Sequence, residues 1–152
     1  MKWAGPVFHF MSQVEGDLGI RIEAAFNYVF RQGARKAVIV ASDVPDLSAE
    51  KIENAINALT DNDIVIGPTN DGGYYLLGMN GVHNDLFHGV TWSTTEVYAE
   101  TLSIIEYLGL KVHCLRALDD IDTEEDLHRW LDASSIEGNP VRRAMQNMAT
   151  TS

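Results

Sequence analysis

The chain has 152 residues, which is the size of one domain and enough to bury a substantial hydrophobic core. Its 45% hydrophobic and 22% charged residues are ordinary for a globular protein and exclude a disordered, collagen-like or coiled-coil chain. The formal net charge of -11 repels phosphate backbones and anionic lipid, which argues against polymeric nucleic acid as a partner. A small phosphorylated ligand would need a divalent cation or a cluster of backbone donors to offset this repulsion.

The sequence carries no sign of a membrane span or of secretion. No apolar run is long enough to cross a bilayer, and the first ten residues lack the pattern of a signal peptide. The single cysteine, Cys114, excludes an intramolecular disulfide framework. We therefore predict a cytoplasmic protein. Because Cys114 lies in an apolar run typical of a buried strand, we expect its thiol to be packed in the core.

Strand-like and helix-like segments alternate along the chain. Short apolar runs predict strands, and segments with the helical apolar period predict helices. The expected strands are 7–10, 37–41, 63–68, 74–78 and 110–115, and the expected helices are 20–30, 48–59, 94–108 and a last one from about 123. The candidate N-caps are Ser48 for the second helix, Ser93 or Thr94 for the third, and Asp122 or Thr123 for the last.

This alternation predicts an α/β layered domain with helices on both faces of a mostly parallel sheet. The unbroken β-branched run 37–41 is typical of a strand buried on both faces of such a sheet. Residues 134–152 show little apolar periodicity, so we predict a domain over 1–133 followed by a tail or a short terminal helix. Ligands of such sheets bind beyond the carboxyl ends of the strands.

Two acidic groups fall at predicted strand ends. Asp43 and Asp46 follow the strand 37–41, and the run 119–122 follows the strand 110–115. Carboxylates flanking a turn suit Mg²⁺ or Mn²⁺, although such residues also cap helices and bind loop amides. If the two strands are near neighbours, Asp43 and Asp120 could share one cation.

Two further segments could contact a ligand. The segment 16–21 places two glycines and Arg21 before a helix, where a phosphate could bind, although the glycines could serve only the turn and Arg21 could pair with a surface glutamate. The segment 70–75 joins a turn, a carboxylate and two tyrosines, a set that could hold a polyhydroxylated acceptor or form a simple hairpin. Trp92 precedes a helix and could line a site or pack in the core. The histidines show no zinc spacing, and no G-x-S-x-G turn is present.

The sequence contains five motif-like segments in a fixed order, at 13–21, 42–47, 67–78, 92–94 and 120–127. Together they resemble the GT-A-like nucleotide-diphospho-sugar transferases of the DUF2064 group, some members of which are labelled as glycosyltransferases of arsenosugar biosynthesis. The resemblance implies a three-layer α/β/α, Rossmann-like GT-A fold whose mostly parallel sheet includes an antiparallel strand. It also implies a metal-dependent glycosyltransferase that uses Mg²⁺ or Mn²⁺ to move a sugar from a nucleoside diphosphate sugar to a small acceptor.

The resemblance also implies roles for individual residues. The positions that match the metal site are Asp43, Asp46, Asp120 and Asp122. The nucleotide side comprises Gln13, Gly16, Gly19, Arg21 and Asp43. The acceptor side comprises Asp71, Gly72, Gly73, Tyr74, Tyr75 and Trp92. Asp71 and Asp120 are the candidates for the catalytic base that takes a proton from the acceptor hydroxyl.

The beginning of the chain departs from the family pattern. Members open with an apolar strand followed by a glycine-containing basic loop for the nucleotide phosphates, and residues 1–12 do not match it. We therefore expect a fragment, or a shortened homologue that covers its sheet edge by swapping or dimerising into a homo-oligomer.

Two alternative functions stay open. The segments 71–73 and 120–122 also resemble guanylyl- and cytidylyltransferase motifs, which makes a nucleotidyltransferase the alternative enzyme. The other alternative is a catalytically silent module that binds a partner or forms oligomers. The sequence leaves the sugar, base, acceptor and stereochemical outcome open.

Overall fold

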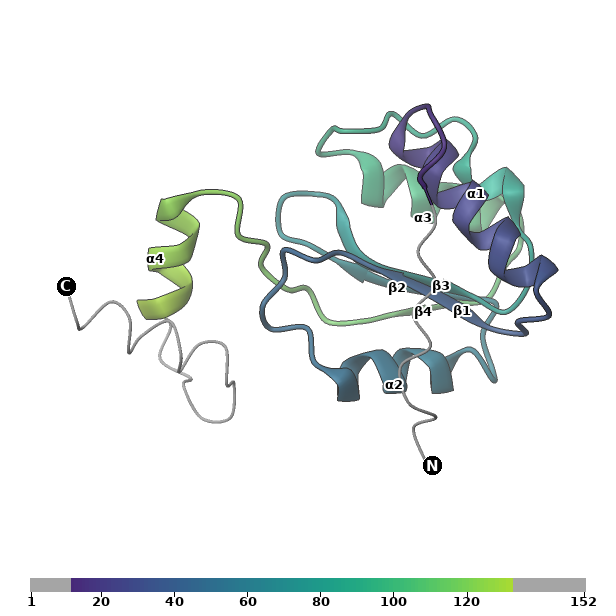
Figure 1. Ribbon diagram of the computed structural model, residues 1–152, viewed down its shortest axis with the longest axis horizontal. Coiled ribbons are helices and arrows are strands. Elements are labelled where there is room, and N and C mark those ends of the chain that lie inside the picture. Colours follow the sequence, from purple (N-terminus) through teal and green to yellow (C-terminus); the bar gives the residue numbers. More distant parts are fainter. Residues whose placement is uncertain (1–11, 133–152) are drawn as a thin grey trace.

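A computed structural model describes residues 12–132 as a four-stranded sheet with four α-helices (Figure 1). In chain order the elements are α1 (Leu18–Arg31), β1 (Ala37–Val40), α2 (Ala49–Ala58), β2 (Ile64–Pro68), β3 (Tyr74–Met79), the 3-10 helix η1 (Asn84–Phe87), α3 (Val97–Tyr107), β4 (Val112–Cys114) and α4 (Glu124–Asp132). Within the described part of the chain, no helix has the length and apolar character needed to cross a membrane. The strand predicted at 7–10 and the tail predicted at 134–152 lie outside the described residues.

The sheet has the order β1-β3-β2-β4. β3 runs antiparallel to both β1 and β2, and β4 pairs in parallel with β2. Consequently β1, β2 and β4 share one direction, and their carboxyl ends meet at the same edge of the sheet. The α/β fold class predicted from the sequence is confirmed. The sequence predicts a mostly parallel sheet, but the central position of the antiparallel strand β3 makes two of the three described strand pairings antiparallel.

Helices cover both faces of the central strands, with α1 and α3 on one side and α2 on the other (Figure 1). Successive side chains of β2 point to opposite faces of the sheet, so this strand contributes to the hydrophobic core on both faces. Ile64 and Ile66 pack in the cluster that includes residues of α1 and α3, whereas Val65 packs with Ala55 of α2 and with Leu59, the C-cap residue of that helix. All of these side chains are at most 1% exposed. Burial of each valine, leucine or isoleucine among them stabilises the fold by roughly 1.5–3 kcal/mol.

Both outer strands are less buried than their sequences predict. Among the described strands β1 pairs only with β3, and Val40 is 41% exposed rather than buried on both faces. Within residues 12–132 β4 pairs only with β2, and Cys114 is exposed, so the prediction of a core thiol is wrong. An apolar run predicts a strand but does not predict its position in the sheet, because that position depends on pairing with distant segments.

The predicted helix starts are confirmed for α2 and α4 but are wrong for α3. The Ser48 side chain accepts from the Lys51 backbone N–H at 3.2 Å, and the Thr123 hydroxyl accepts from the Asp126 N–H at 3.1 Å. α3 begins only at Val97, because the Thr94 hydroxyl donates to the Thr91 carbonyl at 2.7 Å and belongs to the preceding turn. The 3-10 helix η1 has no counterpart in the sequence prediction.

The turn between β2 and β3 docks on the start of α3 through Gly72. The Gly72 carbonyl accepts from the Tyr98 backbone N–H at 2.9 Å. Gly72 has φ +94°, and a Cβ built on it would lie 2.0 Å from the Thr95 carbonyl oxygen. Only glycine therefore meets both the backbone conformation and the close approach.

We expect Gly72→Ala to destabilise the protein by roughly 2–5 kcal/mol, because a left-handed alanine and a backbone collision add together. Gly33→Ala is the matched control: its φ is +95°, but its Cβ would meet nothing within 4 Å, so it should cost only about 1–2 kcal/mol. Urea denaturation measures both values. Equal losses for the two variants would contradict the docking of Gly72 on Thr95.

Candidate functional site

Three loops meet at the sheet edge where β1, β2 and β4 end. The loop after β4 is tied to the other two by backbone hydrogen bonds: Ile121 N–H donates to the Asp43 carbonyl and Leu118 N–H donates to the Pro68 carbonyl, each at 3.1 Å. The Asn70 side-chain amide also donates to the Asp119 carboxylate at 2.5 Å. These bonds hold three segments that are distant in the sequence as one polar surface.

Three carboxylates gather on this surface. Asp43, Asp120 and Asp122 each place one oxygen within 4.8 Å of the oxygens of the other two, and we call them the three-carboxylate group. β1 and β4 are not neighbours, because β3 and β2 lie between them, and it is the loops that bring the acids together. Asp43 and Asp122 are exposed and Asp120 is half-buried. The three negative charges repel one another, and a bound cation would offset this repulsion. Carboxylate oxygens are also the ligands that Mg²⁺ and Mn²⁺ prefer, so the group suits either ion.

Asp46 lies outside this group. Its carboxylate accepts from the Trp130 indole N–H of α4 at 3.0 Å, and its backbone carbonyl accepts from the Lys51 ammonium at 2.9 Å. The observed contacts of Asp46 therefore connect the loop after β1 with α4 and with the start of α2. Its role as a metal ligand stays a prediction.

Asp71 and Asp120 have opposite electrostatic environments. The Thr69 hydroxyl donates to Asp71 at 2.5 Å and the Gly73 N–H donates at 3.0 Å, and these bonds hold the pKa of Asp71 below its usual value. Partial burial, together with the charges of Asp71 and Asp122, raises the pKa of Asp120 to about 6. Asp71 is therefore ionised at neutral pH, whereas Asp120 titrates close to it.

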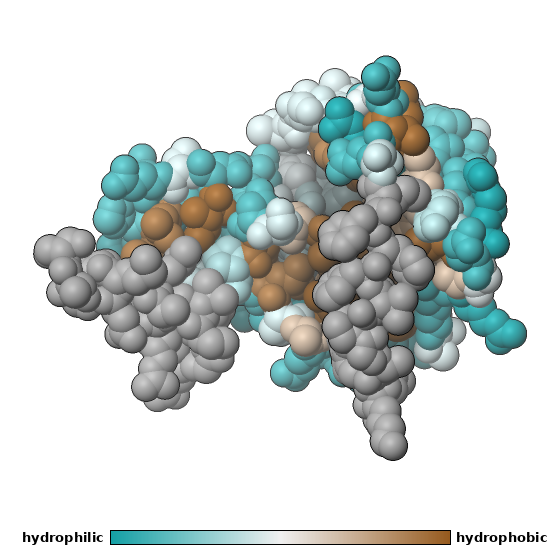
Figure 2. All heavy atoms as spheres, in the orientation of Figure 1, coloured by the Kyte–Doolittle hydropathy of each residue, from teal (hydrophilic) through white to brown (hydrophobic). Residues whose placement is uncertain are grey.

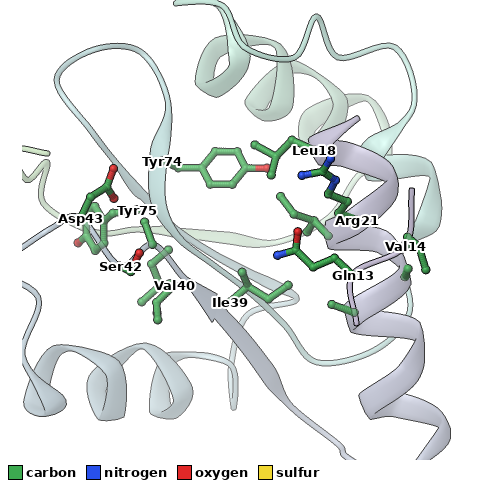
Figure 3. A pocket seen from close by; sticks show the side chains of 15 residues that line it. Gln13, Val14, Leu18, Arg21, Ile39, Val40, Ser42, Asp43, Tyr74 and Tyr75 are labelled. Carbon is green, nitrogen blue, oxygen red and sulfur yellow. The ribbon is translucent and has the colours of Figure 1, made fainter. Parts of the chain in front are cut away.

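A cavity of about 630 Å³ runs between α1 and the sheet, beside β1 (Figure 3). We call it the α1–β1 groove. It contains Gln13, Arg21 and Asp43, three of the five residues predicted for the nucleotide side, and also Tyr74 and Tyr75 from the predicted acceptor side. The remaining lining residues are Val14, Leu18, Ile22, Ala24, Ala25, Ile39, Val40, Ala41, Ser42 and Leu76. A largely apolar groove with a few polar groups is typical of a small-molecule site.

Packing accounts for the other residues of the segment 16–21 and for Trp92. Gly19 is buried beneath Trp92, and a Cβ on Gly19 would lie 2.3 Å from the indole nitrogen. Gly16 has φ +134° and precedes Asp17, whose side chain caps α1 by accepting from Ile20 N–H at 2.9 Å. Backbone conformation and packing therefore explain why Gly16, Gly19 and Trp92 occupy these positions, without the ligand contacts predicted for them.

A second, acidic cavity of about 270 Å³ lies against the loop after β4 and against α4. It is lined by Asn70, Asp71, Asp119, Asp120, Asp122, Asp126, Arg129 and Trp130. Because Asp43 lines the groove while Asp120 and Asp122 line the acidic cavity, the three-carboxylate group stands between the two spaces.

α4 stands at the end of the sheet, apart from the helices that cover the two faces (Figure 1). Hydrophobic residues are visible on α4 and on the adjoining part of the body (Figure 2). Trp130 is 4% exposed and donates to Asp46, so this buried aromatic side chain and its hydrogen bond help to attach α4 to the loop after β1.

Comparison with known proteins places this chain in a family. The family described as "Uncharacterized protein conserved in bacteria (DUF2064)" matches residues 1–94. The chain belongs to the DUF2064 family. The DUF2064 chain is also similar to the crystal structure of a "putative nucleotide-diphospho-sugar transferase" from Desulfovibrio desulfuricans G20, with 33% sequence identity and a TM-score of 0.83. The similarity covers 97% of this DUF2064 chain and 66% of that protein, so the chain spans about two thirds of its length. No curated protein matches this DUF2064 chain.

The raised pKa of Asp120 predicts how the stability of the protein depends on pH. A carboxyl whose pKa is raised on folding binds its proton more tightly in the folded state, so stability falls as pH rises between the usual value of 3.8 and about 6. Without metal, Asp120→Asn should therefore be more stable than the wild type at pH 7.5, and the advantage should disappear below pH 4. Urea denaturation in EDTA across this pH range measures it. An advantage that is the same at both ends would contradict the assignment.

Proposed function

We propose that this DUF2064 chain carries the donor and metal sites of a glycosyltransferase that uses Mg²⁺ or Mn²⁺ to move a sugar from a nucleoside diphosphate sugar to a small acceptor. The observation that carries the proposal is the three-carboxylate group, which stands between an apolar groove and an acidic cavity. The similarity to a protein named for nucleotide-diphospho-sugar transfer supports it. We further propose that the domain has the three-layer α/β/α arrangement of the GT-A fold.

Asp43, Asp120 and Asp122 would hold the cation, which would supply positive charge to offset the diphosphate and to stabilise it as a leaving group. The α1–β1 groove would then take the nucleotide. Among the described residues that line the groove, Arg21 is the one lysine or arginine, and a diphosphate needs a cationic partner in a protein of net charge -11. Asp43 lies in both the groove and the three-carboxylate group, which makes the two sites continuous.

The acidic cavity would take the acceptor. Asp71 lines this cavity and is not part of the three-carboxylate group. The Thr69 and Gly73 donors fix the orientation of its carboxylate and keep it ionised. We assign Asp71 to orient the acceptor hydroxyl and to take its proton as the new glycosidic bond forms. This leaves Asp120 to the cation.

We expect a nucleotide sugar to raise the melting temperature of this chain only when Mn²⁺ is present. A ligand at about 100 times its dissociation constant adds roughly 2.7 kcal/mol to stability, which a thermal shift assay detects. Asp43→Asn should abolish the shift, because it removes the ligand shared by the groove and the cation site. Asp61→Asn is the matched control, since Asp61 is exposed in the turn after α2 and makes the same change of charge. A shift that EDTA leaves intact, or that Asp43→Asn retains, would contradict the proposal.

The released product separates this proposal from the nucleotidyltransferase alternative. Glycosyl transfer from a nucleotide sugar releases a nucleoside diphosphate, whereas nucleotidyl transfer from a nucleoside triphosphate releases pyrophosphate. The paired tyrosines at 74–75 and the segment 92–94 favour the glycosyltransferase reading.

A further inference from the structure

The hydroxyl of Tyr74 is buried without a hydrogen-bond partner. Among the described residues only three buried side-chain polar atoms share this condition, namely Tyr74 Oη, His83 Nε2 and Thr101 Oγ1. Of the three residues, Tyr74 alone lines a cavity of the site. Burial raises the pKa of Tyr74, so the hydroxyl keeps its proton and remains a donor. A buried donor without an acceptor is costly, which calls for a reason other than packing.

The neighbouring tyrosine shows what a structural hydroxyl looks like in this strand. Tyr75 points to the opposite face of β3, its ring packs on Gly67, and its hydroxyl donates to the Arg116 carbonyl at 3.0 Å. Tyr74 packs against the cluster formed by α1 and α3, where its ring does all that a phenylalanine would do. The Tyr74 hydroxyl is therefore superfluous to the core.

Tyr74 reaches across the α1–β1 groove toward α1, to the side where Leu18 and Arg21 lie (Figure 3). Within residues 12–132 the Arg21 guanidinium forms no ion pair and no side-chain hydrogen bond. Leu18 is 49% exposed, so little packing opposes its displacement by a ligand. The Tyr74 hydroxyl and the charged Arg21 guanidinium are thus groove donors that have no acceptor among residues 12–132, in surroundings that are mostly apolar.

We infer that the Tyr74 hydroxyl and the Arg21 guanidinium together bind a phosphoryl group of the ligand in the α1–β1 groove. The inference rests on the proposed function for the identity of the whole ligand, a nucleotide, but the donor pair itself requires only anionic oxygens. It moves Tyr74 from the acceptor side, where sequence resemblance put it, to the nucleotide side. Binding would also satisfy the buried hydroxyl, so the cost present in the free chain is removed in the complex.

The test measures stability and binding in the same variants. Tyr74→Phe should leave the melting temperature of the free chain unchanged or higher, while weakening pyrophosphate binding in EDTA at least fivefold by calorimetry. Arg21→Gln should weaken the same binding at least as much. Tyr98→Phe is the control: the Tyr98 hydroxyl contacts Cys114 away from the groove, so pyrophosphate affinity should not change.

Pyrophosphate without metal tests the donor pair separately from the glycosyltransferase proposal. If nucleotide sugars fail to bind with Mn²⁺ while pyrophosphate binding still depends on Tyr74 and Arg21, the proposed function fails and the inference is supported. Wild-type pyrophosphate affinity in Tyr74→Phe would overturn the inference. So would an absence of pyrophosphate binding in the wild type, or a lower melting temperature in Tyr74→Phe, which would reveal a structural partner for the hydroxyl.

Discussion

The candidate site depends on one constraint, which is that three strands of the same direction end at one edge and that their loops are bonded to one another there. The bond from Ile121 N–H to the Asp43 carbonyl joins the loops after β4 and β1 across the two strands that separate them. Without it, Asp43 and Asp120 would be held on opposite margins of the sheet. With it, the three-carboxylate group forms, and the groove and the acidic cavity become two sides of one site.

This arrangement places a largely apolar groove that contains one cationic side chain beside an acidic cavity. The groove offers Arg21 and the Tyr74 hydroxyl, whereas the acidic cavity offers mainly carboxylates. A ligand with an anionic part and a polyhydroxylated part would meet suitable partners on each side, because carboxylates accept from hydroxyls and cationic groups attract phosphate. A divalent cation between the two would also relieve the charge repulsion that, after burial, raises the pKa of Asp120.

The sequence predicts local features well and those set by distant pairing poorly. The central strands and the Ser48 cap follow from short patterns, and the position of acidic residues after strands indicates the right edge of the sheet. The exposure of Val40 and Cys114 could not be predicted, since it depends on which strands flank β1 and β4. The bond between Asp46 and Trp130 joins residues 84 positions apart, and no local pattern records it. Both Tyr74 and Tyr75 line the groove, and the sequence does not show that the Tyr75 hydroxyl has an acceptor whereas the Tyr74 hydroxyl has none among the described residues.

A titration of this chain with Mn²⁺, followed by electron paramagnetic resonance, shows whether loops from separate strands build one divalent cation site. We expect one saturable site whose affinity falls at least tenfold in each of Asp43→Asn, Asp120→Asn and Asp122→Asn, while Asp61→Asn binds as the wild type does. Equal affinity in all four variants and in the wild type would contradict it, because the three carboxylates would then be neighbours without a common ligand.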